Sequence, residues 1–271
     1  SLAPVSCTKP PAASPAAGRR VLVLGGNGFV GSEVARQAVA RGWQVTSLSR
    51  RGAPGGESGA APISGVEYVR GDATDASVAR GVLAEGGFCA VVHAVGMLFD
   101  SDLNLLVSGS GSKPGDGATY DAVTRQTAEN AMAAAAELLV PGEGGSPPPF
   151  VFVSAAEAGW NFVPPTPGDF LGRYLEAKRA VESALMDGYV GRLRATVLRP
   201  SLVWTPERPG ALPSIAAFTA ANALGVPFVD KPVRVETLAG AALAALEDTS
   251  VSGVQDFRGM EALAAGGAGA Q

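Results

Sequence analysis

Short apolar stretches alternate along the chain with longer segments in which apolar residues recur every three or four positions. The short stretches predict buried strands, and the longer segments predict helices that bury one face. Strands are expected at residues 21–24, 44–49, 66–70, 89–94, 150–154 and 195–198, and helices near 30–38, 76–83, 120–139, 171–186, 214–224 and 238–247. This alternation predicts an α/β fold: a doubly wound parallel sheet with helices on both faces.

The same pattern indicates how the chain is organised. It predicts a disordered arm, a sheet domain, a small C-terminal lobe that completes the same domain, and a disordered tail, at residues 1–18, 19–204, 205–264 and 265–271. Two connections are long for such a fold. Residues 101–118 are expected to form an active-site or partner-binding loop, and residues 141–149 a solvated insertion.

Composition and charge exclude several classes of protein. A net charge of −4 gives no basic field that would recruit nucleic acid, and no apolar run approaches the length that spans a bilayer. With His93 as its one histidine and Cys7 and Cys89 as its two cysteines, the chain has no set of ligands for a metal site or a disulfide framework. We therefore expect a soluble or peripheral protein without a bound metal. A start at Ser1 rather than Met indicates either a processed precursor, which would mean an organellar address, or an arbitrary boundary.

The most specific motif follows the first predicted strand, where Gly25, Gly28 and Gly31 stand three residues apart. The first glycine allows a tight turn, the second lets a pyrophosphate approach the backbone, and the third lets the next helix pack closely on the sheet. That helix opens with Phe29 and Val30, and the N–H groups of its first turn then face the phosphates. The motif predicts a dinucleotide site, with a structural turn that binds no nucleotide as the alternative.

The second predicted strand ends where the ribose of such a dinucleotide would lie. It runs into Ser49, Arg50 and Arg51, with no acid before Glu57. Because a 2′-phosphate needs cationic donors and a free 2′-hydroxyl is usually held by an acid, NADP(H) is favoured over NAD(H). The alternative is a solvated charge pair at the start of a loop. After the third strand, Asp72 is expected to accept a hydrogen bond from adenine or, alternatively, to cap the next helix.

Three residues near the ends of later strands are candidates for chemistry. Tyr174 and Lys178 stand four apart on one predicted helix and so share a face. An ammonium near a phenol lowers the pKa of the phenol, which can then exchange a proton beside a hydride-transfer centre. Ser154 is the third candidate, a hydroxyl to hold a substrate carbonyl oxygen, although Ala156 stands where a further serine is expected. The alternative is a surface pair on the helix, and His93 is expected to be packed near the cofactor rather than to act as a base.

Together these residues resemble the extended and atypical branch of the short-chain dehydrogenase/reductases, over nearly the whole chain from Arg20 to Ala264. The resemblance implies a Rossmann fold with an NAD(P)-binding domain, and a catalytic pair of Tyr174 and Lys178 in which Lys178 also contacts the cofactor. It also implies cofactor contacts from the glycine loop, the ends of the second, third and fourth strands, and a Leu-Arg-Pro turn beside the nicotinamide. These contacts are Gly25, Gly28, Phe29, Val30, Gly31, Ser49, Arg50, Arg51, Asp72, Ala94, Val95, Gly96 and Pro200.

Within that branch, longer runs are most similar to a mitochondrial group, the coenzyme Q biosynthesis factors of the eleventh COQ type and their plant and algal relatives. These runs include residues 24–31, 47–50 and 153–159. The resemblance implies a protein on the matrix side of the mitochondrial inner membrane, peripherally associated with that membrane, with a chloroplast as the alternative location. Its partners would be subunits of the ubiquinone-synthesising complex, or of respiratory complex I, whose NADPH-binding accessory subunit has the same fold.

Three functions are compatible with these observations. The first is an NADP(H)-binding oxidoreductase acting on a quinone precursor, with Tyr174 as acid or base, Lys178 tuning it and Ser154 as a weak oxyanion partner. The second is a non-catalytic NADPH-binding subunit of complex I or another large organellar complex. The third is an organellar scaffold or RNA-associated protein, which the acidic charge balance disfavours.

Overall fold

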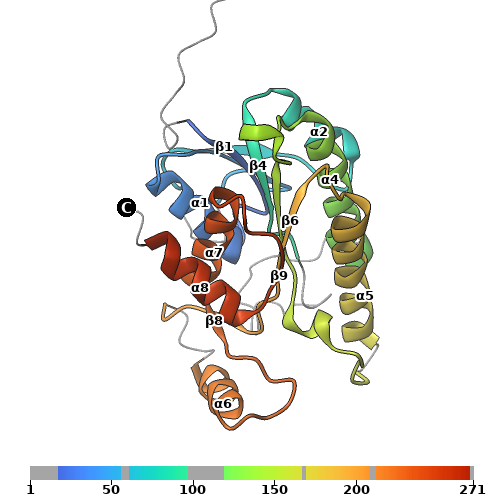
Figure 1. Ribbon diagram of the computed structural model, residues 1–271, viewed down its shortest axis with the longest axis vertical. Coiled ribbons are helices and arrows are strands. Elements are labelled where there is room, and N and C mark those ends of the chain that lie inside the picture. The colour runs from blue at the N-terminus through green and yellow to red at the C-terminus, as the bar shows by residue number, and fades with distance from the viewer. Residues whose placement is uncertain (1–17, 56–60, 97–118, 167–168, 208–211, 269–271) are drawn as a thin grey trace, which may run out of the picture.

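The computed structural model describes residues 18–55, 61–96, 119–166, 169–207 and 212–268. Within them, seven parallel strands form one sheet in the order β3-β2-β1-β4-β5-β6-β9, with helices on both faces (Figure 1). The strands are β1 (Arg20–Leu24), β2 (Gln44–Ser49), β3 (Val66–Arg70), β4 (Phe88–His93), β5 (Pro149–Val153), β6 (Arg194–Leu198) and β9 (Gly253–Gln255). The predicted α/β fold is confirmed, whereas the expected loop at 101–118 lies outside the described residues.

The order of the strands reverses between β1 and β4. From β1 the chain passes outward through β2 to β3, then returns to β4 and runs outward on the other side. Leu24 of β1 is in register with Leu48 of β2 and with His93 of β4, so the carboxyl ends of these three strands lie side by side. Open α/β sheets bind their ligands at this edge, where the order reverses.

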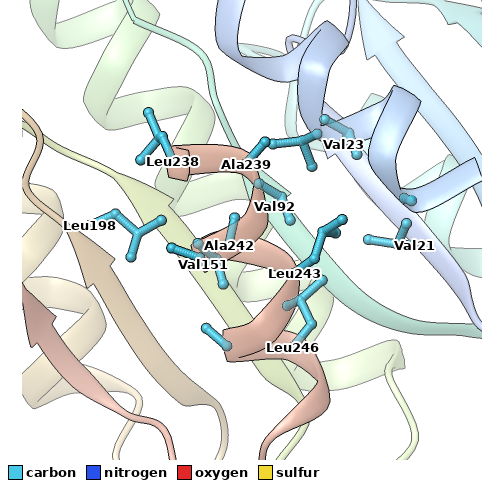
Figure 2. Close-up of a cluster of buried hydrophobic side chains, with 14 of the residues drawn as sticks. Val21, Val23, Val92, Val151, Leu198, Leu238, Ala239, Ala242, Leu243 and Leu246 are labelled. Carbon is cyan, nitrogen blue, oxygen red and sulfur yellow. The ribbon is translucent and has the colours of Figure 1, made fainter. Parts of the chain in front are cut away.

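Two layers of helices bury the two faces of the sheet. One face is covered by α1 (Phe29–Ala40) and α7 (Val235–Glu247), with α8 (Phe257–Ala268) packed against α7. The other face is covered by α2 (Ala76–Ala84), α4 (Thr127–Leu138) and α5 (Phe170–Ser183). Figure 2 shows Leu238, Ala242 and Leu243 of α7 against Val92 and Val151 of the sheet. Because α7 lies between the sheet and two helices, it is apolar on nearly every side.

The long helices predicted at 120–139 and 171–186 are confirmed, but each contains a change of winding. A π-helical turn, η2 (Asp121–Gln126), precedes α4, and another, η6 (Ala184–Gly188), follows α5. Two single 3₁₀ turns, η3 (Glu143–Gly145) and η4 (Ala156–Gly159), flank β5. None of the described helices has the length and apolar character needed to cross a bilayer.

Two predictions about the C-terminal part are wrong. The lobe expected at 205–264 is smaller, because α7, β9 and α8 belong to the main sheet and its helix layer. Only α6 (Leu212–Ala223) stands apart, in the segment between the short parallel strands β7 (Val203–Trp204) and β8 (Val233–Arg234) (Figure 1). The disordered tail expected from residue 265 is also wrong, since α8 continues to Ala268. A Cβ atom at Gly267 would lie 3.7 Å from the side chain of Ala244, so the end of α8 packs on α7.

Candidate functional site

The glycine loop between β1 and α1 is built around close backbone contacts. Gly25 has φ +80°, and its N–H donates to the carbonyl of Leu48 at 2.9 Å. The N–H of Gly28 donates to the carbonyl of Gly25 at 2.8 Å, which closes the turn. A Cβ atom at Gly31 would lie 2.2 Å from that same carbonyl oxygen. The tight turn at Gly25 is confirmed, and the close approach at Gly31 is made to the loop itself.

A fourth glycine is needed here, although the spacing of the motif does not reveal it. A Cβ atom at Gly26 would lie 2.5 Å from Oγ of Ser47, a buried hydroxyl on β2. The loop therefore lies directly on the end of β2. Because these positions carry no side chains, backbone atoms line the loop, which we call the glycine cradle. Such a lining fits the close approach of a pyrophosphate.

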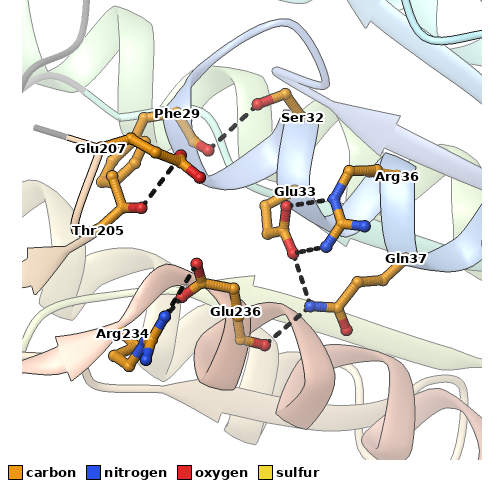
Figure 3. A network of polar contacts seen from close by, with 9 residues as sticks. All are labelled: Phe29, Ser32, Glu33, Arg36, Gln37, Thr205, Glu207, Arg234 and Glu236. Atoms are coloured by element: carbon orange, nitrogen blue, oxygen red, sulfur yellow. Dashed lines mark hydrogen bonds and ion pairs between the residues drawn. The ribbon is translucent and has the colours of Figure 1, made fainter.

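The N-terminus of α1 suits an anion. Gly28 is the N-cap residue, it offers no side-chain cap, and the first turn, which begins with Phe29 and Val30, contains no acidic residue. The N–H groups and the dipole of such a turn favour a negative group. Figure 3 shows how α1 is held in place: Nε2 of Gln37 donates to Glu33 at 2.8 Å and to the backbone carbonyl of Glu236 at 2.9 Å, at the start of α7.

The residues after β4 connect the glycine loop with Lys178. The N–H of Ala94 donates to the carbonyl of Leu24 at 3.0 Å, and a Cβ atom at Gly25 would lie 3.0 Å from the carbonyl oxygen of Ala94 and 3.2 Å from the side chain of Val95. A Cβ atom at Gly96 would lie 3.4 Å from Nζ of Lys178. The structure therefore brings the predicted contacts after β1 and β4 together with the predicted lysine.

The end of β2 forms the adjoining wall. Oγ of Ser49 donates to the carbonyl of Gly52 at 3.1 Å, and Nδ2 of Asn27 donates to the same carbonyl at 3.0 Å, which ties the glycine loop to this turn. Arg50 and Arg51 are exposed on it. The turn that carries them is tied to the glycine loop through Asn27, and their contact with a ribose phosphate stays a prediction.

Asp72 lies after β3, and one of its two predicted roles is corrected. Its Oδ1 accepts hydrogen bonds from the backbone N–H and the hydroxyl of Thr74, at 3.0 and 2.9 Å. The N-cap of α2 is Asp75, whose carboxylate accepts from the N–H of Ser77 at 2.8 Å. Asp72 therefore does not cap the helix, and its exposed carboxylate remains as the predicted adenine contact.

Tyr174 and Lys178 share a buried face of α5, as their spacing predicts. Nζ of Lys178 lies 5.9 Å from the centre of the Tyr174 ring and donates to the carbonyl of Val153 at 2.7 Å. Tyr174 is 9% exposed and Lys178 3% exposed, so the alternative of a pair on the helix surface is wrong. Burial lowers the pKa of Lys178 to about 8, with the nearby Glu182 carboxylate acting in the opposite direction.

The expected effect on Tyr174 is reversed in this structure. Burial raises the pKa of its phenol, and the neighbouring Glu157 and Tyr120 raise it further. Burial disfavours the phenolate, and the nearby Glu157 carboxylate repels it. Tyr174 is therefore held in its protonated form, ready to donate rather than to accept a proton.

Ser154 is hydrogen-bonded to other parts of the protein in this structure. Its hydroxyl donates to Oε1 of Glu182, and its N–H donates to the carbonyl of Leu198 at 2.8 Å. The single hydroxyl proton is thus donated to a buried carboxylate, and a contact with a substrate oxygen stays a prediction. Ala156, where a serine was expected, has no hydroxyl, and its N–H donates to the carbonyl of Pro200 at 2.8 Å.

His93 is packed, as predicted. It is fully buried, and Nε2 lies 2.9 Å from Oγ1 of Thr127. Because the Thr127 hydroxyl donates to the carbonyl of Val123 at 2.7 Å, it accepts from His93, which places the imidazole proton on Nε2. Burial, reinforced by Lys178, lowers the pKa of His93 to about 3, so the ring is neutral and does not act as a base at physiological pH.

Sequence reasoning missed two acidic residues at the site, Glu182 and Glu157. Glu182 accepts from Arg199 at 3.0 Å as well as from Ser154, and Glu157 is a mostly buried carboxyl near Tyr174 whose pKa is raised by burial and by Asp230. One signal was available: Glu182 follows Lys178 by four residues, and therefore lies on the same face of α5. Within the described residues, no group of acids, histidines and cysteines could hold a metal ion.

Comparison with known proteins indicates which class of ligand the glycine cradle binds. A protein-family model described as NAD(P)H-binding matches residues 25–249, from the first glycine of the loop to the end of α7. The chain belongs to this family. The description covers both nicotinamide coenzymes, so it supports the predicted dinucleotide site and leaves the choice between NADP(H) and NAD(H) open.

Two relatives share part of the sequence. The chain is 47% identical over 53 residues to an uncharacterized chloroplastic protein of Arabidopsis thaliana, a match that covers 20% of this chain and 17% of that protein. It is 27% identical over 207 residues to the 2-alkyl-3-oxoalkanoate reductase of Stenotrophomonas maltophilia, covering 73% of this chain and 54% of that enzyme. The chain thus spans about half the length of the Stenotrophomonas enzyme, and its match to the Arabidopsis protein covers a smaller share of that protein.

Solved structures agree on the fold. The chain is similar to a short-chain type dehydrogenase/reductase from Mycobacterium ulcerans, with a TM-score of 0.62 and 22% identity over 90% of each chain. It is also similar to the UDP-glucose 4-epimerase of Thermus thermophilus in complex with NAD, with a TM-score of 0.59, 23% identity, and coverage of 92% of this chain and 82% of that one. The fold is therefore that of the short-chain dehydrogenase/reductases, as the sequence resemblance implied.

Proposed function

We propose that this chain is an NADP(H)-dependent atypical short-chain dehydrogenase/reductase that reduces a carbonyl group of a quinone precursor in mitochondrial ubiquinone biosynthesis. One observation carries the proposal. The glycine cradle, Gly96 and Nζ of Lys178 lie together where the strand order reverses, and Tyr174 lies beside the lysine. The substrate class and the mitochondrial address come from the resemblance to the coenzyme Q biosynthesis factors.

The chain's own groups favour reduction over oxidation. When bound, the reduced nicotinamide supplies the hydride that adds to the carbonyl carbon. Tyr174, whose pKa burial raises, keeps its proton and can give it to the carbonyl oxygen, which becomes a hydroxyl. Charged Lys178 then stabilises the phenolate until solvent returns the proton. The name of the Stenotrophomonas relative, an oxoalkanoate reductase, supports this direction.

The coenzyme would be held by parts of the chain that are already in place. The glycine loop and the start of α1 would bind the pyrophosphate, and Asp72 the adenine. Arg50 and Arg51 would bind a 2′-phosphate, which is the basis for preferring NADP(H). The segment Ala94–Gly96 and Pro200 would line the nicotinamide end.

The test is NADPH oxidation by the purified chain with a short-tailed benzoquinone as the acceptor. Tyr174→Phe removes one oxygen atom from a buried ring, and we expect turnover to fall about 100-fold to 10,000-fold while the affinity for NADPH stays unchanged. Tyr189→Phe, in the connection after η6, is the matched control and is expected to keep wild-type turnover. Wild-type turnover in Tyr174→Phe would overturn the proposed chemistry.

A second function is favoured by the residues at positions 154 and 156, where catalytic hydroxyl groups were expected. Ser154 is committed to Glu182 and Ala156 has no hydroxyl, which fits a protein that binds NADPH without turning it over. We propose as the alternative a structural subunit of respiratory complex I or another large organellar complex. Such a subunit would co-purify with a membrane complex and retain unoxidised NADPH. A chloroplast is the alternative address, supported by the name of the Arabidopsis relative.

A further inference from the structure

The segment from residue 212 to residue 229, called the α6 lobe here, has an unusual surface. It contains no Asp, Glu, Lys, Arg or His. Within α6 only Ile215 is buried, and the lobe stands away from the two helix layers at the lower end of Figure 1. Its large exposed apolar side chains, with the exposed fraction of each, are Leu212 (42%), Phe218 (40%), Leu224 (83%), Val226 (44%) and Phe228 (57%).

The exposure surrounds α6 instead of following one stripe. Residues 216–220 are all exposed, and five consecutive residues span more than one helical turn. The polar residues of α6 are Ser214, Thr219 and Asn222, none of them charged, and apolar residues are exposed around the rest of the helix. A helix with apolar residues on all sides is normally buried in a protein core or in a membrane. The flat surface of a protein partner would cover one side of such a helix, whereas the acyl chains of a bilayer can cover every side of a projecting lobe at once.

The polar groups of the α6 lobe are largely satisfied within it. The hydroxyl of Thr219 donates to the carbonyl of Ile215 at 2.7 Å, and the amide of Asn222 donates to the carbonyl of Val229 at 2.8 Å. The N–H groups of Leu224 and Val226 donate to carbonyls of α6 at 3.0 Å each. Each such bond lowers the cost of leaving water, because an unpaired polar group in hydrocarbon costs several kcal/mol.

An aromatic cluster joins the lobe to the rim of the site. The ring of Trp160 stacks on Phe162 at 5.3 Å, and Phe162 meets the edge of Phe228 at 4.9 Å. Phe228 adopts φ +64°, a costly conformation for a bulky residue, and its ring remains in the cluster. Trp160 follows η4, and its carbonyl accepts from Arg179 of α5, the helix that carries Tyr174. Trp is favoured at membrane interfaces, and Phe is common on the apolar face of segments that lie in such an interface.

Charged side chains resume where the lobe meets the body. Asp230 follows the last apolar residue, and Lys231 pairs with Glu261 of α8 at 2.7 Å. A lipid surface would therefore stop at this boundary. Since α6 follows β6, the lobe lies toward the carboxyl edge of the sheet, the edge that carries the glycine loop and the Tyr174 pair.

We propose that the α6 lobe inserts into the surface of a lipid bilayer and holds the carboxyl edge of the sheet, with the glycine loop and the Tyr174 pair, close to the acyl phase. This inference rests on the proposed function, and it names the surface that would make the peripheral membrane association implied by the resemblance to the coenzyme Q biosynthesis factors. A substrate with an apolar tail could then reach Tyr174 without leaving the lipid.

Flotation of the full chain with pure phosphatidylcholine vesicles tests the contact. Phosphatidylcholine carries no net charge, and it is chosen because the lobe has no charged side chain. Binding is therefore expected to be insensitive to salt. Leu224→Glu places a charge on a side chain that is already 83% exposed, so the fold should tolerate it, and the bound fraction is expected to fall at least tenfold. Val140→Glu, at a site 74% exposed between α4 and β5, is the matched control and should float like the wild type.

Two further measurements separate lipid from other occupants. Quenching of tryptophan fluorescence by brominated acyl chains is expected in the wild type and should be largely lost in Trp160→Phe. Sedimentation velocity without lipid should show a monomer. A wild-type chain that stays off the vesicles, or a dimer that Leu224→Glu dissociates, would overturn the proposal. Because flotation requires no turnover, Tyr174→Phe should still bind vesicles, and the failure of the reductase proposal would be seen separately.

Discussion

Arg199 donates from Nε to Oε1 of Glu182 at 3.0 Å and from a second nitrogen to Oε2, so the two side chains form a two-pronged ion pair. The Glu182 side chain is 8% exposed and the Arg199 side chain 26% exposed. Ser154 donates to the same carboxylate. The end of β5, the end of β6 and α5 are thereby joined one helical turn away from Lys178.

Removing one partner of this pair should be costly. Glu182→Ala leaves a guanidinium and a hydroxyl without their acceptor, and we expect the free energy of unfolding to fall by about 3 kcal/mol. Urea denaturation at pH 7 measures it. The double variant Glu182→Ala/Arg199→Ala should lose less than the sum of the single variants. The exposed pair of Lys231 and Glu261 is the control, with an expected change of about 1 kcal/mol or less; strictly additive losses at Glu182 and Arg199 would contradict the coupling.

The glycine loop gives a sharper prediction, because two glycines differ in what a methyl group would meet. At Gly31 a Cβ atom would lie 2.2 Å from the carbonyl oxygen of Gly25, which is backbone and cannot move aside cheaply. Gly31→Ala should therefore displace α1 from the loop and weaken NADPH binding at least about 10-fold, the factor that corresponds to 1.4 kcal/mol. Gly81→Ala, inside α2, meets no atom within 4 Å and should leave binding unchanged. Isothermal titration measures both, and equal affinities in the two variants would contradict the role of Gly31.

Local patterns predicted the six longer strands and the glycine loop, because each is encoded by neighbouring residues. The strand β9 was missed, since Gly253-Val254-Gln255 offers one apolar residue and its pairing with β6 is a distant contact. The whole of α8 was missed for a related reason: its Ala- and Gly-rich sequence resembles a flexible tail, and packing on α7 supplies the order.

The chemistry of the site was predicted only in part. The spacing of Tyr174 and Lys178 shows that they share a face, but the sign of the pKa shift depends on burial and on Glu157, which approaches from η4. Likewise, nothing near Ser154 in the sequence indicates that its hydroxyl is bound to Glu182, 28 residues away. Identity of side chains is local information, whereas their partners are set by the tertiary fold.

The choice of coenzyme can be tested at the end of β2. If Arg50 faces a 2′-phosphate, Arg50→Ala should weaken NADPH binding by about 10-fold, the loss of one charge-assisted contact of 1.5 kcal/mol or more, and leave NADH binding almost unchanged. Arg258→Ala, on α8, controls for the loss of a surface charge. The measurement is the ratio of the two dissociation constants at fixed ionic strength. A ratio that Arg50→Ala leaves untouched would mean that Arg50 is solvated and that NADP(H) is not preferred through it.

The buried ammonium of Lys178 should make stability depend on pH in a defined direction. The pKa of lysine in an unfolded chain is about 10.4, whereas burial lowers that of Lys178 to about 8. Below pH 8 both states are charged, and the folded state bears the full cost of burial. Between these pKa values the folded chain loses its proton and the unfolded chain keeps it, so the free energy of unfolding rises with pH, by roughly 3 kcal/mol in all.

Comparison with Lys178→Met isolates this contribution, because the other titrating groups cancel in the difference. From pH 7.5 to pH 10.5 the wild type should gain stability relative to the variant, and a constant difference would mean that the lysine has the same pKa in both states.

The loss of the Lys178 proton should also limit the rate of the proposed reaction. Neutral Lys178 cannot stabilise the phenolate of Tyr174, so quinone-dependent NADPH oxidation should fall about tenfold per pH unit above pH 8, in the range where the folded chain becomes more stable.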